Sequence, residues 1–233
     1  MKYCYEYPHP AVAVDIVVFT LIEGLLHLLL IKRKGDPHKG LWALPGGFVQ
    51  MAETVEEAAL RELHEETGME SPQPDKRSPC ATPKLLGIYS NPQRDSRERV
   101  ISIAYMTCVR ASSVNLEAGT DALEAKWWPA ESLPAPAFDH ATIIGDARRA
   151  LKQGAMREPW AAQMIANPFR ITELQQATEK VLGSPIDKRN FRRLFKERME
   201  STQSETFTYQ PSTAEPVRGR HRPAQLFELR FRG

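Results

Sequence analysis

Three glutamates, Glu62, Glu65 and Glu66, lie close together in a segment that spans residues 53–67. The segment has no Gly or Pro and is rich in Ala, Leu and Glu, so it predicts a helix that ends at Gly68. At about 100° per residue, the three carboxylates share one face of that helix. Like charges so close repel one another unless a cation lies among them. The spacing therefore indicates a site for a positive charge.

A divalent cation such as Mg²⁺ is the simplest occupant of this acidic face. Hard divalent ions take oxygen ligands, usually one or two carboxylates with waters and substrate phosphates. A metal ion held there would polarise a phosphoryl oxygen and orient or deprotonate an attacking water, which is metal-assisted hydrolysis of a phosphoanhydride. The spacing of the charges leaves a second interpretation open, a solvated acidic helix face that binds nothing.

The composition is that of an ordinary globular protein, with 233 residues, 42% of them hydrophobic, and 31 Lys and Arg against 29 Asp and Glu. This argues against a chain that is disordered throughout. Charge is unevenly distributed, because residues 1–153 carry a net −3 and residues 154–233 a net +5. We therefore predict two domains, 1–153 and 154–233, the first able to hold metal or substrate and the second able to meet a polyanion.

Three features predict a soluble, cytoplasmic protein that has no membrane partner. The most apolar stretch, residues 11–31, is interrupted by Asp15, Glu23 and His27, so it is unsuited to span a membrane. The first ten residues lack the apolar run of a signal peptide. The three cysteines are odd in number and lack zinc-site spacing, which is typical of unpaired thiols in a reducing compartment.

The first domain is predicted to be an α/β layered structure. A helix over residues 138–152 follows the strands, and a proline-rich loop covers residues 70–83. Apolar and β-branched runs predict strands over residues 11–20, 25–32, 84–89, 100–109 and 123–128, and two short strands around the Pro45-Gly46-Gly47 turn within residues 41–49.

The second domain contains the signature of a helix-turn-helix. Thr172 and Gln175 predict a capping box at the start of one helix, and Gly183 ends it. Ser184-Pro185 is predicted to begin the next helix, with Ser as the cap. Two alternating runs, residues 205–209 and 226–231, then predict a two-stranded ribbon.

Basic residues gather on the second helix of this motif and in the loop of the ribbon. A winged helix-turn-helix would present these side chains to the grooves and phosphates of DNA, although a solvated basic helix is the alternative interpretation. The candidate DNA-binding residues are Lys188, Arg189, Arg192, Arg193, Lys196, Arg218, Arg220 and Arg222.

The acidic segment resembles the Nudix box at every defining position. The pattern Gly-x5-Glu-x7-Arg-Glu-Leu-x-Glu-Glu-x-Gly-Met covers residues 47–69. The resemblance implies an α/β/α sandwich with a mixed sheet. It also implies hydrolysis of a nucleoside diphosphate linked to another moiety, with Mg²⁺ or Mn²⁺ as the cofactor.

The resemblance also assigns roles position by position. It implies that Glu65 and Glu66 are metal ligands, that Glu62 is a ligand or the general base, and that Gly47 offers its carbonyl to the metal. Glu53 would support the site at the start of the helix.

Arg61 would pair with a carboxylate and hold the helix against its loop. The catalytic set implied is therefore Glu53, Arg61, Glu62 and Glu66. The base stays shared between Glu62 and Glu66, and Glu98 in a later loop could also reach the site.

Further residues are similar to Nudix domains that handle ADP-ribose. They lie in residues 41–49, 94–95, 100–105, 127–129 and 138–140, together with Arg33. The substrate-binding residues that this similarity implies are Arg33, Gly46, Phe48, Arg94 and Asp95.

The residue types leave the roles of the arginines and aromatic residues open. Arg33 and Arg94 could pair with a pyrophosphate in fork geometry or could be surface arginines. Trp42, Trp127 and Trp128 are more often core residues than adenine platforms. His140 is expected to be a structural residue at a helix start rather than a catalytic one.

The second domain resembles that of the Nudix-related transcriptional regulators (NrtR), in residues 169–174, 182–193 and 218–226. The wing differs from the plainer Gly-Arg-Gly-Arg-Pro form, because His221 stands between its arginines. The resemblance implies a homodimeric repressor of NAD-metabolism genes that binds a double-stranded DNA operator. ADP-ribose or a related NAD-derived ligand would be the effector, although some relatives regulate sugar catabolism instead.

Three hypotheses follow from the two halves of the chain. In the first, the protein is a ligand-controlled repressor whose intact box still hydrolyses ADP-ribose to AMP and ribose 5-phosphate. In the second, it is a plain Nudix hydrolase whose appended domain serves dimerisation or RNA contact. In the third, the box is a catalytically silent ligand sensor.

Overall fold

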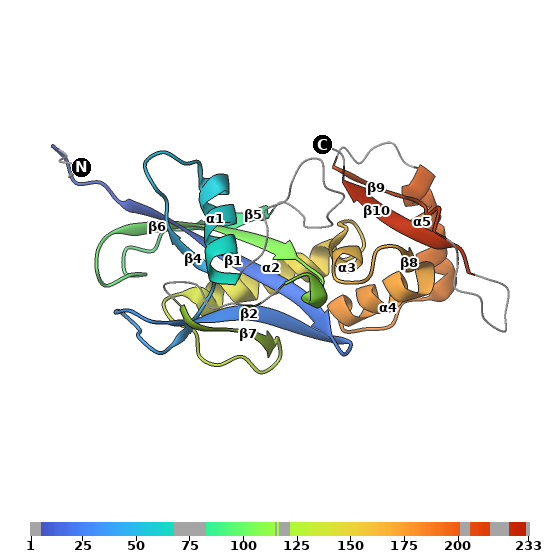
Figure 1. Cartoon of the computed structure of the whole chain (residues 1–233), viewed down its shortest axis with the longest axis horizontal. Helices are drawn as coiled ribbons and strands as arrows, with labels where there is room; N and C mark the ends of the chain where they lie inside the picture. The colour runs from blue at the N-terminus through green and yellow to red at the C-terminus, as the bar shows by residue number, and fades with distance from the viewer. Residues whose placement is uncertain are drawn as a thin grey trace.

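The computed structural model describes residues 6–67, 83–114, 116, 122–200, 206–214 and 224–231. The predicted helix end at Gly68, most of the predicted loop 70–83 and the wing arginines Arg218, Arg220 and Arg222 lie outside these residues. Two domains lie side by side along the longest axis of the molecule (Figure 1). No helix within the described ranges is long and apolar enough to cross a membrane.

A seven-stranded mixed sheet forms the centre of the first domain. Its path runs β3-β2-β1-β6-β5, with β4 paired to β1 and β7 paired to β2. β1 and β6 are parallel, and the other pairs are antiparallel. The strands are β1 (Ala11–Ile22), β2 (Leu25–Arg33), β3 (Trp42–Ala43), β4 (Gly46–Phe48), β5 (Lys84–Tyr89), β6 (Val100–Cys108) and β7 (Ala122–Pro129).

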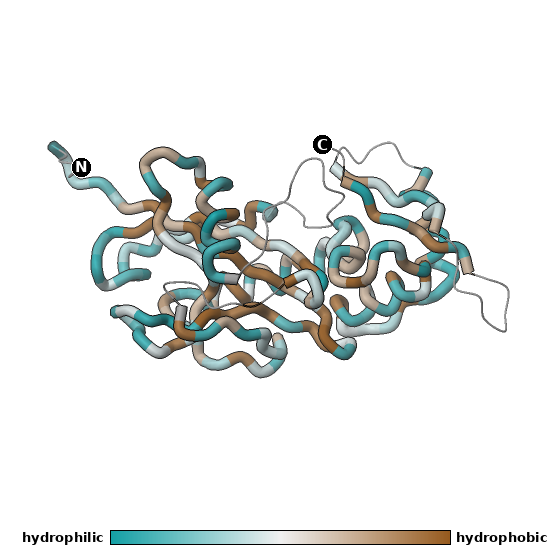
Figure 2. Tube along the Cα trace, in the orientation of Figure 1, coloured by the Kyte–Doolittle hydropathy of each residue, from teal (hydrophilic) through white to brown (hydrophobic). Residues whose placement is uncertain are grey.

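Two helices cover the two faces of this sheet, α1 (Val55–Thr67) and α2 (His140–Gly154). The period-2 alternation of β1 separates the faces. Val14, Ile16 and Val18 pack in the cluster that includes α1 residues, whereas Val17 and Phe19 pack in the cluster that includes α2 residues. Hydrophobic residues accordingly run along the central strands (Figure 2). The predicted α/β/α sandwich with a mixed sheet is confirmed.

The sequence located the elements of the first domain to within two residues at each described end. The helix of the box begins at Val55 rather than at Glu53. Thr54 caps this helix, because its hydroxyl accepts the Glu57 N–H at 3.2 Å and its own N–H donates to the Glu57 carboxylate at 2.7 Å. This capping box leaves Glu53 in the loop before the helix.

The second domain has three helices and a three-stranded sheet of order β8-β10-β9 among the described residues. The predicted ribbon is confirmed, although its first strand begins at Phe207. The short strand β8 was not predicted. The elements are α3 (Trp160–Gln163), β8 (Phe169–Arg170), α4 (Ile171–Leu182), α5 (Lys188–Glu200), β9 (Phe207–Pro211) and β10 (Leu226–Phe231).

Two predicted helix starts in the second domain are wrong. The predicted capping box of Thr172 and Gln175 is not formed, because the Glu173 carboxylate instead accepts the Arg170 N–H at 2.7 Å and α4 begins at Ile171. Helix α5 begins at Lys188 rather than at Ser184-Pro185.

Asp187 caps the start of α5, since its carboxylate accepts the Asn190 N–H at 2.9 Å. The Ile186 N–H, one residue earlier, is held by Glu179 of α4 at 3.0 Å. This bond keeps the chain from entering the helix at Pro185 and sets the turn between the two helices.

The two domains share hydrophobic core. Trp160, Met164 and Val181 of the second domain pack in the same cluster as Ile143 and Leu151 of α2. Gly154, the last residue of α2, lies so close to the Trp160 ring that an added Cβ would be 2.3 Å from it. The second domain therefore packs against the first through apolar contacts.

Gly183 ends α4 in the left-handed region, with φ of +74°, and its N–H donates to the Glu179 carbonyl at 2.8 Å. A Cβ at Gly183 would meet nothing within 4 Å, so only the backbone conformation would be strained. We expect Gly183→Ala to lower the free energy of unfolding by about 1 kcal/mol, measured by urea denaturation.

Gly145→Ala is the matched control, because Gly145 lies within α2 with equally open surroundings. An alanine inside a helix should raise the free energy of unfolding by about 0.5–1 kcal/mol. Stabilisation by both substitutions would contradict the left-handed helix end at Gly183.

Candidate functional site

A cavity of about 460 Å³ opens between β1, β4, α1 and the start of α2. It is lined by the predicted residues Arg33, Gly46, Gly47, Phe48, Glu62, Glu66, Arg94 and Asp95. Asp15, Arg97, Phe138 and His140 also line it, whereas Glu53, Arg61 and Glu65 lie outside its wall.

Two adjacent glycines let the backbone of β4 approach its neighbours. Gly46 has φ of +154°, and a Cβ on it would lie 2.1 Å from the Val14 carbonyl oxygen of β1. A Cβ on Gly47 would lie 2.2 Å from Oε1 of Glu62 and would displace that carboxylate. The pair of glycines therefore places β4 directly against the acidic face of α1.

Arg61 is the cation around which the acidic residues of the box gather. Its guanidinium lies 2.6 Å from Glu53, 2.6 Å from Glu62 and 3.2 Å from Glu65. It also donates to the Phe48 carbonyl at 3.2 Å, which joins the helix to β4. Three carboxylates thus share one positive charge.

The carboxylates of the box differ in environment. Hydrogen bonds from Arg61 lower the pKa of Glu53 to about 2. Burial raises the pKa of Glu62, against the opposing effect of Arg61. Glu66 is 5% exposed, and its carboxylate accepts the Gly46 N–H at 2.8 Å. Of the carboxylates of the box, Glu62 and Glu66 line the cavity, and Glu66 is the most buried.

The carboxylate oxygens of the box suit a divalent metal ion, but their side chains do not surround a single metal position. Within the part of the chain that the structure describes, no three His, Cys, Asp or Glu side chains converge on one metal position. The carboxylates of Glu62 and Glu65 instead form ion pairs with Arg61. The excess of negative charge around Arg61, together with the carboxylate oxygens at the cavity wall, fits a hard cation such as Mg²⁺ or Mn²⁺.

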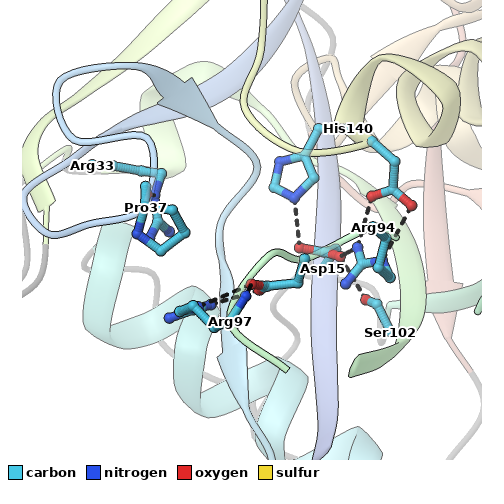
Figure 3. Close-up of polar contacts among 9 residues, drawn as sticks. Asp15, Arg33, Pro37, Arg94, Arg97, Ser102 and His140 are labelled. Atoms are coloured by element: carbon cyan, nitrogen blue, oxygen red, sulfur yellow. Dashed lines mark hydrogen bonds and ion pairs between the residues drawn. The ribbon is translucent and has the colours of Figure 1, made fainter. Parts of the chain in front are cut away.

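A buried carboxylate, Asp15, joins the cavity to the sheet and to α2 (Figure 3). It accepts hydrogen bonds from Ser102 at 2.5 Å and Arg94 at 3.0 Å, and it lies 3.2 Å from Nε2 of His140. Nδ1 of His140 accepts the Leu44 N–H at 2.9 Å, so the Nε2 proton is the one donated to Asp15. Burial opposes ionisation of Asp15, yet these partners outweigh it and lower its pKa to about 2.

Arg94 lies in the cavity wall with its charge already neutralised. Its side chain is 5% exposed, and besides Asp15 it contacts the Asp139 carboxylate at 2.8 Å and 3.1 Å. Asp139 immediately precedes α2. Arg94 therefore connects β1 to the start of α2 at the cavity wall. Its role in substrate binding stays a prediction.

Two other guanidinium groups lie against the ring of Phe138 at the cavity. The Arg33 guanidinium carbon is 4.8 Å from the ring centroid, and that of Arg97 is 6.0 Å away. Arg97 also lies 5.3 Å from the Phe48 centroid and is held by Asp95 at 2.7 Å. An aromatic ring thus brings two cations together at one wall.

Sequence reasoning did not place Asp15 or Arg97 in the site, and it included Phe138 only as part of the motif at residues 138–140, without a role of its own. A signal for Asp15 was present, because it is a charge in the middle of an apolar strand. Arg97 and Phe138 carry no spacing signal, since they meet only in the folded chain. His140 is the first residue of α2, as expected, and Glu98 is exposed outside the cavity wall.

The tryptophans are core residues rather than walls of this cavity. Trp42 and Trp128 stack edge to face at 5.2 Å and pack against the cluster under α2. Trp127 packs against the opposite cluster.

Helix α5 presents its basic residues to solvent. Phe191 and Phe195 are buried in the core of the second domain. The described candidates Lys188, Arg189, Arg192, Arg193 and Lys196 are all exposed. Their roles stay predictions, and two of them, Arg193 and Lys196, also pair with Glu197 and Glu200 of the same helix.

Comparison with known proteins agrees with both halves of the fold. A model of the NUDIX domain matches residues 9–147, and a model of the NrtR DNA-binding winged helix domain matches residues 161–229. The predicted boundary between residues 153 and 154 falls in the gap between the two models and stays a prediction.

Relatives resemble the chain in part or along nearly its whole length. An ADP-ribose pyrophosphatase of Methanocaldococcus jannaschii is 50% identical over 143 residues, which cover 61% of this chain and 76% of that protein. A transcriptional repressor of Acinetobacter baylyi, described as ADPR responsive, is 28% identical over 228 residues, which cover 96% of this chain and 84% of that protein.

The crystal structure of Shewanella oneidensis NrtR complexed with a 27mer DNA superposes with a TM-score of 0.72 at 29% identity, covering 94% of this chain and 93% of that one. The NUDIX model alone matches more than half of the chain. The chain therefore belongs to the Nudix family, and it joins a Nudix domain to a DNA-binding winged helix domain of the NrtR type.

Proposed function

We propose that this protein is an ADP-ribose-responsive transcriptional repressor whose Nudix domain hydrolyses ADP-ribose to AMP and ribose 5-phosphate. One observation carries the proposal: a cavity lined by the carboxylates of an intact box is joined, in one chain, to an exposed basic helix. We assign ligand binding and hydrolysis to residues 1–153 and DNA binding to residues 154–233. Binding to operator DNA would place the protein in the cytoplasm, acting on genes of NAD metabolism.

Glu62, Glu65 and Glu66, with the carbonyl of Gly47, are the residues that would hold the metal ion. Bound Mg²⁺ or Mn²⁺ would supply charge stabilisation to the diphosphate and lower the pKa of the attacking water. Glu53 and Arg61 keep the acidic residues in position through the ion pairs described above. Glu62 and Glu65 pair with Arg61 in this structure, and a bound metal ion would compete with Arg61 for these two carboxylates.

Glu62 or Glu66 would take the proton of the attacking water. Both line the cavity, and burial raises the pKa of Glu62 toward the range in which a carboxylate accepts a proton more readily. Water then adds to one phosphorus atom, and the bond from that phosphorus to the bridging oxygen breaks. The two products each keep one phosphate.

Glu66→Gln tests the hydrolytic half. The glutamine oxygen can still accept the Gly46 N–H, so the fold is expected to survive while a charged ligand and candidate base is lost. We expect AMP release from ADP-ribose, measured by chromatography with Mg²⁺ and then Mn²⁺, to fall by about 10²-fold or more.

Glu57→Gln is the matched control on the same helix, because Glu57 is exposed and glutamine also suits a capping box. It should leave turnover unchanged. A wild-type protein that binds ADP-ribose without releasing AMP would instead be a catalytically silent sensor.

DNA recognition is assigned to α5 and to the wing arginines Arg218, Arg220 and Arg222. A homodimer would set two α5 helices about 34 Å apart, so that they enter successive major grooves of the operator.

Arg192→Ala tests the DNA-binding half, because Arg192 is an exposed cation of α5. We expect weaker binding to duplex DNA from the protein's own operon in fluorescence anisotropy. The slope of log affinity against log salt concentration should fall by about one released counterion per binding site. ADP-ribose hydrolysis should be unaffected.

Arg157→Ala removes the same charge from an exposed position outside α5 and should leave DNA affinity unchanged. A wild-type protein that ignores this duplex, or binds all duplexes alike, would be a plain Nudix hydrolase whose second domain serves dimerisation or RNA contact.

A further inference from the structure

The cavity has walls of opposite charge. Glu62 and Glu66 face it from α1, whereas Arg33 and Arg97 face it from the end of β2 and from the loop before β6. A ligand that lies across the cavity therefore meets Glu62 and Glu66 on one side. On the other side it meets guanidinium groups, where Asp15 and Asp95 also line the cavity but are paired with Arg94 and Arg97. A diphosphate suits this arrangement, because its oxygens pair with guanidinium groups directly and with carboxylates through a metal ion.

Three arginines line the cavity, but they differ in what they can donate. Nε and Nη2 of Arg94 donate to two carboxylates, Asp139 and Asp15, and its side chain is 5% exposed. Arg97 uses the same two nitrogens on a single carboxylate, Asp95, and its side chain is 40% exposed, so Nη1 is accessible to a ligand. Arg33 uses Nε on the Pro37 carbonyl at 3.0 Å, which leaves its two terminal nitrogens.

Phe138 and Phe48 hold the two available guanidinium groups in place. Both rings line the cavity. The Arg33 guanidinium is 4.8 Å from the Phe138 centroid, and that of Arg97 is 5.3 Å from the Phe48 centroid and 6.0 Å from the Phe138 centroid. Burial and the proximity of Arg97 lower the pKa of Arg33, so the two like charges repel each other. An anion between them relieves that repulsion.

Resting on the proposed function, we infer that Arg33 and Arg97, stacked on Phe138, hold the diphosphate of the ligand. Arg94 is then a positioning residue that keeps the wall in place. This assignment differs from the sequence-based pairing of Arg33 with Arg94.

The test is the affinity of full-length Arg97→Met and Arg33→Met for ADP-ribose, measured by calorimetry in the Glu66→Gln background with Mg²⁺. Methionine keeps the contact with the aromatic rings and removes the donors. We expect each variant to bind ADP-ribose about 10- to 100-fold more weakly, as for a lost charged hydrogen bond. Inorganic pyrophosphate should lose affinity by a similar factor.

Arg99→Met is the matched control, since Arg99 lies in the same loop, is exposed and does not line the cavity. Wild-type affinity in both Arg97→Met and Arg33→Met would overturn the inference. Failure of the proposed function would give a different result from failure of this inference. A wild-type chain that binds pyrophosphate through these arginines but not ADP-ribose would keep the anion site and exclude ADP-ribose as the ligand.

A second observation concerns helix α2, whose two ends touch two different sites. At its start, His140 contacts Asp15 and the preceding Asp139 contacts Arg94, both in the cavity wall. Just beyond its end, the Met156 carbonyl accepts a hydrogen bond at 2.6 Å from Arg198 of α5. Its 15 residues span about 22 Å.

Arg198 is the one described basic residue of α5 that turns inward. It is half-buried, and its guanidinium also lies 5.1 Å from the Phe207 ring centroid. Trp160, packed against Gly154, closes the same end of α2. Arg198 therefore links α5 to the segment that directly follows α2.

We propose that α2 transmits ligand occupancy from the cavity to α5, and that Arg198 is the positioning residue at the DNA-binding end. This rests on the proposed response of DNA binding to ADP-ribose. A ligand that binds at Arg33 and Arg97 alters the wall in which Arg94 and Asp15 hold the start of α2. Ligand and DNA must then weaken each other by the same factor.

The test is the ratio of the DNA dissociation constants with and without saturating ADP-ribose, in the Glu66→Gln background. For an allosteric protein this ratio is typically about 5 to 150. We expect Arg198→Met to bring the ratio toward 1, and Arg198→Lys, which keeps a charged donor, to preserve most of it.

Arg193→Met is the matched control on the outer face of the same helix. It should weaken DNA binding and leave the ratio unchanged. A wild-type ratio in Arg198→Met would overturn the role of α2 alone, whereas a ratio of 1 in the otherwise unaltered chain would overturn the proposed ligand response as well.

Discussion

The buried carboxylate of Asp15 is the interaction on which the site depends. A charge inside a sheet is tolerated only when it is paired and hydrogen-bonded, and removing one partner of such a pair commonly costs about 3–5 kcal/mol. Its partners come from β6, from the loop before β6 and from the start of α2. The hydrogen bonds and ion pairs of the Asp15 carboxylate therefore fix the relative positions of the segments that form one wall of the cavity.

The same strand also organises the opposite wall and the second domain. Val14 and Asp15 of β1 pair with Gly47 and Gly46 of β4, which places β4 against the carboxylates of α1. Leu21, six residues beyond Asp15 on the same face, packs against the hydrophobic cores of both domains. Ligand site and DNA-binding domain are thus parts of one packed structure rather than modules on a free linker.

Short-range patterns predicted most of the fold. The alternation of β1 and the uninterrupted helix of the box are local properties, and the structure agrees with both to within two residues. The helix starts at Thr172 and Ser184 were predicted wrongly for one reason. Each of these residues is a good cap, but Glu173 and Glu179 supply carboxylates that hold nearby N–H groups instead. Which cap forms depends on which partner can reach it in three dimensions.

The sequence by itself determined the chemistry of the acidic face and the basic helix, because the spacing of charges on a helix follows from its pitch. It also determined the family, through the box around Glu62 and Glu66. Only the tertiary structure decided which arginines remain available to a ligand. Arg94 and Arg97 are three residues apart and chemically identical, yet Arg94 is 5% exposed between Asp15 and Asp139, whereas Arg97 pairs, among the described residues, only with the nearby Asp95 and is 40% exposed at the cavity. Their difference arises from partners that are remote in the chain, and a sequence pattern does not encode that proximity.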